Sequence, residues 1–193
     1  MFRKPSFSPI FTHIGRNLRR LGASMTDLKS LYEQDTVVWA ENQAAALRAA
    51  AKGGSNQALD WENLAEEIED LAKNLRIGLK SQLFRIIQHH IKLTYSPASD
   101  PRRGWRRTIR QARYEIEQIL DESPSLRGHI PQMIESETRQ AIEYAIKDLQ
   151  EYDEISGLSI PTVRRVRYSE DQILGDWFPP EREHEPPERG GQP

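Results

Sequence analysis

The chain has 193 residues, with 27 Lys and Arg against 29 Asp and Glu, five His and no Cys, so its formal net charge is −2. The absence of Cys excludes disulfide scaffolds, thiolate zinc sites and Cys nucleophiles. No apolar run reaches the roughly 18 residues that cross a bilayer, so we expect a cytoplasmic protein without a membrane span.

The apolar composition favours helix over sheet. It includes 34 Leu or Ile but only four Val, whereas strands are enriched in β-branched residues such as Val. We therefore predict an all-α fold, a bundle of four to five helices with one long helix and a docked C-terminal turn.

Residues 1–24 form a basic leader of charge +5 that contains no acidic residue, and Met25 follows directly. We expect that Met25 is the true start of the protein. A transit peptide or a nucleic-acid-binding arm is the alternative interpretation of the leader. Residues 25–179 are predicted to form a single helical domain.

Two helices are predicted in the first half of this domain. Asp35 is the expected N-cap of a helix over 36–51. Asp60 is the expected N-cap of the long helix, over about 60–93, because apolar residues recur there every three or four positions. Gly78 lies inside the long helix and predicts a kink or a close helix contact.

A third helix is predicted over 102–121, and Ser123-Pro124 is typical of the N-cap and first position of a fourth helix that continues to about Tyr152. Because Gly128 and Pro131 interrupt the fourth helix early, we expect either a kinked helix or a short turn followed by a long one.

The chain is predicted to be less regular after this point. Residues 160–168 show weak extended character. Residues 169–171 are expected to cap a single helical turn, which docks on the bundle because four large apolar side chains follow closely, namely Ile173, Leu174, Trp177 and Phe178. Residues 180–193 are dominated by Glu, Arg, Pro and Gly and are predicted to be a disordered tail.

Six strings of residues are distinctive. They are LYEQD at 31–35, LDWENLAEEIE at 59–69, HHIKL at 89–93, GWRRTIR at 104–110, SPSL at 123–126 and QILGDWFP at 172–179. These strings resemble a bacterial family common in cyanobacteria, the domain of unknown function family 29, over about residues 27–179. The resemblance implies an all-helical fold and a bacterial origin, and it implies no activity, cofactor or partner.

The third predicted helix carries a dense group of arginines without any acidic residue among them. They are Arg102, Arg103, Arg106, Arg107, Arg110 and Arg113. At 100° per residue, three of them flank the apolar stripe around Trp105 and three lie further round the helix. They can bind phosphates of a nucleic acid, or they can pair with the acidic start of the long helix. The net charge of −2 favours internal pairing, because most nucleic-acid-binding proteins have a strong positive field.

His90 lies on the apolar stripe of the long helix, so we expect either a buried core histidine or a metal ligand that faces the bundle interior. A metal site would need carboxylates from other helices, since no Glu precedes His89 or His90 by three residues. Candidates are Glu115, Glu117, Glu135 and Glu137.

We identify no catalytic residue and no cofactor motif. We therefore expect a non-catalytic interaction or accessory protein with an unknown protein partner. One alternative is nucleic-acid binding through residues 102–113. The other is a metal-dependent enzyme that uses His90.

Overall fold

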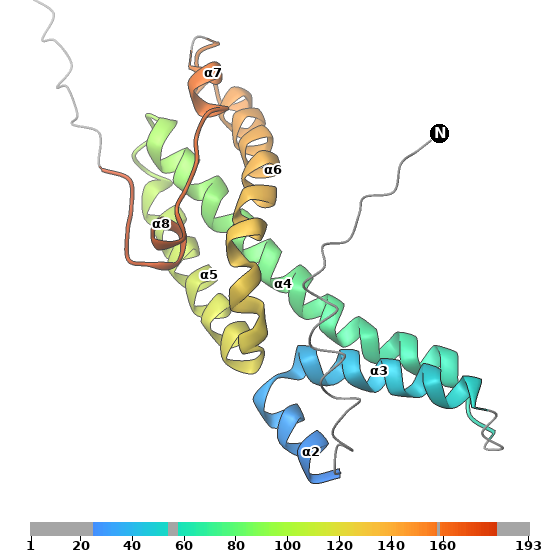
Figure 1. The fold of residues 1–193 in the computed structure, drawn as a ribbon. Coiled ribbons are helices and arrows are strands. Elements are labelled where there is room, and N and C mark those ends of the chain that lie inside the picture. Colours follow the sequence, from blue (N-terminus) through green and yellow to red (C-terminus); the bar gives the residue numbers. More distant parts are fainter. Residues whose placement is uncertain (1–24, 54–57, 158, 181–193) are drawn as a thin grey trace, which may run out of the picture. The chain divides into compact units, whose positions relative to one another are not determined.

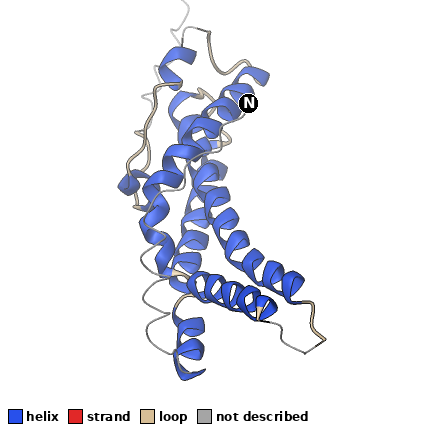
Figure 2. Ribbon diagram, turned by 45° about the vertical axis from the view of Figure 1, so that its right-hand side comes forward, coloured by secondary structure: helices blue, strands red, loops and turns tan. Residues whose placement is uncertain are grey.

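The computed structural model describes residues 25–53, 58–157 and 159–180. The predicted leader and the predicted tail beyond Pro180 lie outside the described residues. Every regular element in the described part of the chain is a helix (Figure 2), which confirms the all-α prediction. None of these helices combines the length and apolarity that a membrane-spanning segment needs.

The helices are α2 (Met25–Gln34), α3 (Thr36–Lys52), α4 (Trp61–Tyr95), α5 (Arg102–Glu122), the 3-10 helix η1 (Pro124–His129), α6 (Ile130–Glu151), α7 (Ile160–Val163) and α8 (Glu170–Leu174). They form two compact units. The first contains the described residues up to Ile77 together with Ile119–Arg127, and the second contains Gly78–Gln118 and the described residues from Gly128 onward. The boundary within α4 therefore falls at Gly78.

In the first unit, α3 lies alongside the first half of α4 (Figure 1), and two ion pairs, Arg48 with Glu69 and Arg76 with Glu41, join them. The buried residues of this unit include several alanines, which allow helices to pack closely. Ala65 and Ala72 are seven residues apart on α4 and are fully buried. Leu71 fits the apolar period of α4, but it is 46% exposed because one residue of helix turns it about 100° from Ala72.

The second unit contains the last half of α4, most of α5, and α6 (Figure 1). Their inward faces supply fully buried aliphatic side chains, among them Leu83, Ile86 and Ile109. The segment after α6 returns over this core, with Ile173 of α8 fully buried. The prediction of a docked C-terminal turn is therefore confirmed.

Local capping explains several helix ends. The Asp35 carboxylate accepts a hydrogen bond from the Val38 amide at the start of α3, and Ser169 forms a capping box with Gln172 at the start of α8. Of the two forms expected before α6, the structure has the short turn followed by a long helix. The extended character expected for 160–168 is wrong at its start, where α7 forms a single helical turn.

Candidate functional site: the arginines of α5 and the buried histidine

The arginines of α5 divide into an exposed and a half-buried set. Arg103, Arg107 and Arg110 are exposed, and their spacing of four and three residues places them on one side of the helix. Tyr114 continues the same line and is 56% exposed. We call these four residues the basic stripe. The sequence periodicity predicted this division of the arginines correctly.

Among the described residues of the second unit, no carboxylate pairs with Arg103, Arg107 or Arg110 of the basic stripe. Within the first unit, Glu69 pairs with Arg48 and Asp70 pairs with Lys73 at the acidic start of α4. The three guanidinium groups therefore have no carboxylate partner among the described residues of their own unit.

Arg113, on the half-buried side of α5, binds the C-terminal segment. Its Nε donates to the carbonyl oxygen of Ile173 at 2.9 Å, and its Nη2 donates to those of Gln172 at 3.1 Å and Trp177 at 2.7 Å. The ring of Phe178 lies 5.0 Å from the Arg113 guanidinium carbon and 5.3 Å from that of Arg106. Burial lowers the pKa of Arg113, but an arginine remains protonated in proteins. Arg113 therefore holds the docked segment in place.

His90 lies behind this segment and is fully buried. Its ring centroid is 5.6 Å from that of Tyr168, 5.0 Å from that of Trp177 and 6.0 Å from that of Phe178. Burial, and next the positive charge of Arg113, lower the pKa of His90 to about 3. The imidazole is therefore neutral at pH 7, and its Nε2 lies 3.5 Å from Arg113 Nη2.

The surroundings of His90 are those of a core histidine. Its neighbours are aromatic rings and a guanidinium group, which repels cations. Among the described residues, no group of three or more His, Asp and Glu side chains is placed to hold a metal ion. In the described part of the chain, the candidate carboxylates Glu115, Glu117, Glu135 and Glu137 thus do not form such a group with His90.

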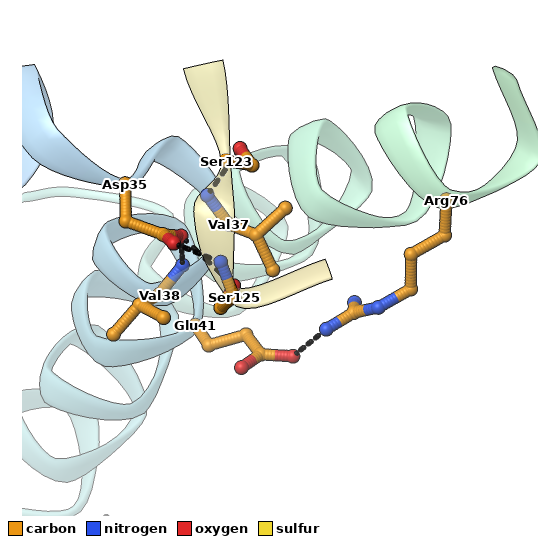
Figure 3. Close-up of polar contacts among 7 residues, drawn as sticks. All are labelled: Asp35, Val37, Val38, Glu41, Arg76, Ser123 and Ser125. Carbon is orange, nitrogen blue, oxygen red and sulfur yellow. Dashed lines mark hydrogen bonds and ion pairs between the residues drawn. The ribbon is translucent and has the colours of Figure 1, made fainter. Parts of the chain in front are cut away.

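A second polar cluster lies in the first unit (Figure 3). The Asp35 carboxylate, 8% exposed, accepts from the Ser125 amide at 2.7 Å and from the Ser125 hydroxyl at 3.1 Å, in addition to its cap of α3. The Ser123 hydroxyl accepts from the Val37 amide at 3.3 Å. The start of α3 is thus tied to the start of η1.

Sequence reasoning missed both long-range roles. It predicted Asp35 only as an N-cap and Arg113 only as part of a basic cluster. A signal for these contacts was present in the strings that carry the family resemblance. Asp35 ends the string at 31–35, Ser123 and Ser125 belong to the string at 123–126, and the carbonyl groups bound by Arg113 belong to the string at 172–179.

Comparisons with known proteins agree with this fold and give no activity. The model of a family described as Domain of unknown function DUF29 matches residues 31–178. A crystal structure of an alpha-helical protein of unknown function from Rhodospirillum rubrum is similar, with a TM-score of 0.60 and 28% sequence identity, and the match covers 77% of this chain and 91% of that chain. No curated protein matches this chain.

Proposed function

The chain belongs to the family Domain of unknown function DUF29, and from this premise and the geometry of α5 we propose that it is a non-catalytic interaction protein that binds an acidic helix of a partner protein through the basic stripe. The observation that carries this proposal is the line of three exposed arginines that pair with no carboxylate among the described residues of the second unit.

The basic stripe has the geometry of a helix-binding surface. Arg103 and Arg110 are seven residues apart, so their backbones lie about 10 Å apart along the helix axis. Ile109 and Ala112 are fully buried on another side of α5, so the stripe rests on a packed helix. Arginine forms bidentate contacts with carboxylates, and exposed tyrosine is enriched at the centre of protein interfaces.

The charge pattern favours a protein over a nucleic acid. Glu117 is exposed and seven residues beyond Arg110, so it continues the line of the stripe with the opposite charge. A nucleic-acid backbone presents phosphates throughout, and Glu117 would repel it. A partner helix with acidic residues followed by a basic one would match the whole line. The net charge of −2 also gives no long-range attraction for a polyanion.

The test uses fluorescence anisotropy with the full chain and three labelled probes. The first is an amphipathic helical peptide with Glu at positions i, i+4 and i+7, the second is the same peptide with Gln in place of Glu, and the third is a short duplex DNA. The stripe variant carries Arg103→Glu, Arg107→Glu and Arg110→Glu. The control variant carries Arg139→Glu, Lys147→Glu and Arg165→Glu, which make the same charge change at exposed positions outside the stripe.

We expect the Glu peptide to bind the wild-type protein and the control variant, and to bind the stripe variant at least tenfold more weakly, because three ion pairs become repulsive. The Gln peptide should bind the wild-type protein more weakly than the Glu peptide does, because it forms no ion pairs with the stripe. Duplex DNA that binds more tightly than the Glu peptide, with a salt dependence lost in the stripe variant, would replace the protein partner by nucleic acid. Equal binding of both peptides would refute a role for the arginine charges.

A further inference from the structure

A cavity of about 300 Å³ lies in the second unit, where α4 and α6 end and α5 begins. Its lining includes Lys92, Trp105, Asp148, Leu149, Tyr152 and Glu154. The volume is at the lower limit of cavities that bind small molecules. The basic stripe does not contribute to this lining, so the cavity is a separate feature from the proposed interaction surface.

The end of α6 is closed by a turn that positions two of the lining residues. The Asp153 amide donates to the Gln150 carbonyl at 3.1 Å, and the Glu154 amide donates to the Leu149 carbonyl at 2.7 Å. These two bonds form a Schellman motif, in which Asp153 takes the left-handed conformation with φ of 54°. The motif fixes the backbone of Tyr152 and Glu154 at the cavity.

The cavity already surrounds one cation of the protein itself. The Lys92 ammonium lies 2.6 Å from the Asp148 carboxylate and 6.0 Å from the centroid of the Trp105 ring. Gln88 also donates to this carboxylate, at 2.8 Å. A carboxylate combined with an aromatic face is a typical environment for an ammonium or guanidinium group.

Glu154 adds a second carboxylate to the lining, and no ion pair occupies it within the described part of the chain. One lysine and two carboxylates give the lining a net charge of −1. Two helices, α4 and α6, have their carboxyl ends at the cavity, which favour a positive charge, and they outnumber the one amino end there, that of α5. The negative charge of the lining and its aromatic surface therefore both favour a cationic ligand.

We propose that this cavity binds a small organic cation, a primary ammonium or guanidinium group carried by an aromatic or short apolar body. The cationic group pairs with Glu154, and the body lies against Trp105 and Tyr152. The same chemistry is offered by a free amine and by a lysine or arginine side chain of a peptide, and the test separates these two sources.

The test measures binding to the full-length protein by the shift of the Trp105 indole N–H signal in ¹H–¹⁵N NMR spectra, which Trp105→Phe assigns. Three probes share an aromatic body and differ in charge. They are 2-phenylethylamine, 2-phenylethanol and 3-phenylpropanoate. A fourth probe, N-acetyl-phenylalanyl-arginine amide, represents a peptide side chain. The variant Glu154→Gln removes the charge and keeps the shape, and Glu151→Gln, an exposed residue outside the lining, is the matched control.

We expect saturable binding of the amine, at least tenfold weaker binding of the neutral and anionic probes, and about tenfold weaker binding of the amine to Glu154→Gln but not to Glu151→Gln. Tighter binding of the dipeptide than of the amine would identify a peptide as the source of the cation, and the reverse order would identify a free amine. The proposal is overturned if the amine does not shift the Trp105 signal, if the three small probes bind equally, or if both glutamine variants behave alike.

Discussion

Replacing Asp35 with alanine is expected to lower the free energy of unfolding of the first unit by about 3 kcal/mol. The N-cap of α3 accounts for about 1 kcal/mol of this loss. The two hydrogen bonds from the Ser125 amide and hydroxyl to the buried carboxylate add about 1 kcal/mol each. Because these two contacts join segments 90 residues apart, their loss also frees the start of η1 from the start of α3.

The assay is urea unfolding followed by circular dichroism and tryptophan fluorescence, with Asp60→Ala as the matched control. Asp60 also caps a helix, since its carboxylate accepts from the Asn63 amide at 3.3 Å, but it is exposed and its side-chain contacts are local. We expect Asp60→Ala to cost only about 1 kcal/mol. A double-mutant cycle between Asp35→Ala and Ser125→Ala should give a coupling energy of about 1 kcal/mol.

The reasoning is refuted if Asp35→Ala costs no more than Asp60→Ala, because the carboxylate would then act only as a local cap. A coupling energy of zero in the cycle would show that the hydrogen bond from the Ser125 hydroxyl contributes nothing. Hydrogen exchange gives an independent measurement, since the Ser125 amide should lose protection in Asp35→Ala and retain it in Asp60→Ala.

Four further predictions concern the second unit. Arg113→Lys should loosen the docked C-terminal segment, because an ammonium group cannot form the three hydrogen bonds that the guanidinium group donates to carbonyl oxygens. Limited proteolysis should cut this variant within residues 168–180 at least tenfold faster than the control Arg110→Lys, which changes an arginine of the basic stripe. Lowering the pH from 7 to 5 should reduce the free energy of unfolding of the wild type by about 2 kcal/mol more than that of His90→Gln, as measured by urea unfolding. The folded His90 has a pKa of about 3, below its ordinary value, so only the unfolded chain takes up a proton in this range. An equal pH dependence of the two proteins would contradict this. Gly175→Ala should lower the melting temperature, because a Cβ would lie 2.6 Å from the Asp171 carbonyl oxygen, whereas Gly104→Ala in α5 has nothing within 4 Å and should raise it. Asp153→Gly should stabilise the protein by about 0.5–1 kcal/mol in urea unfolding because glycine adopts a φ of 54° without strain, and Asp153→Ala should give no such gain.

The starts of α3, α4, α5 and α8 were predictable because their signals are local. Asp35 and Ser169 cap the helices that follow them, and each bonds a backbone amide only three residues away. The division of the α5 arginines followed from the period of the helix, since residues seven apart share a side whatever surrounds them. The buried position of His90 followed from its place on the apolar stripe of α4.

The core of the first unit was predicted less well. Leu71 fits the apolar period, yet Ala65 and Ala72 are fully buried and Leu71 is exposed. Periodicity gives the apolar side of a helix, but the width of that side exceeds what one neighbouring helix covers. Which part of it becomes buried depends on where the neighbour lies, and that position is not encoded in the helix itself.

The amino-acid sequence by itself determined the helical class, the starts of α3, α4, α5 and α8 and the exposed line of arginines on α5, because caps and helical period depend on residues close along the chain. Only the tertiary structure decided that Arg113 holds the C-terminal segment and that Asp35 is bound to the start of η1. The physical reason is that these bonds go to backbone groups: Arg113 donates to three carbonyls, and Asp35 accepts from the Ser125 amide. Every residue has a backbone carbonyl group, and every residue except proline has a backbone N–H group. The pattern of side chains therefore does not predict which of these backbone groups will be bound.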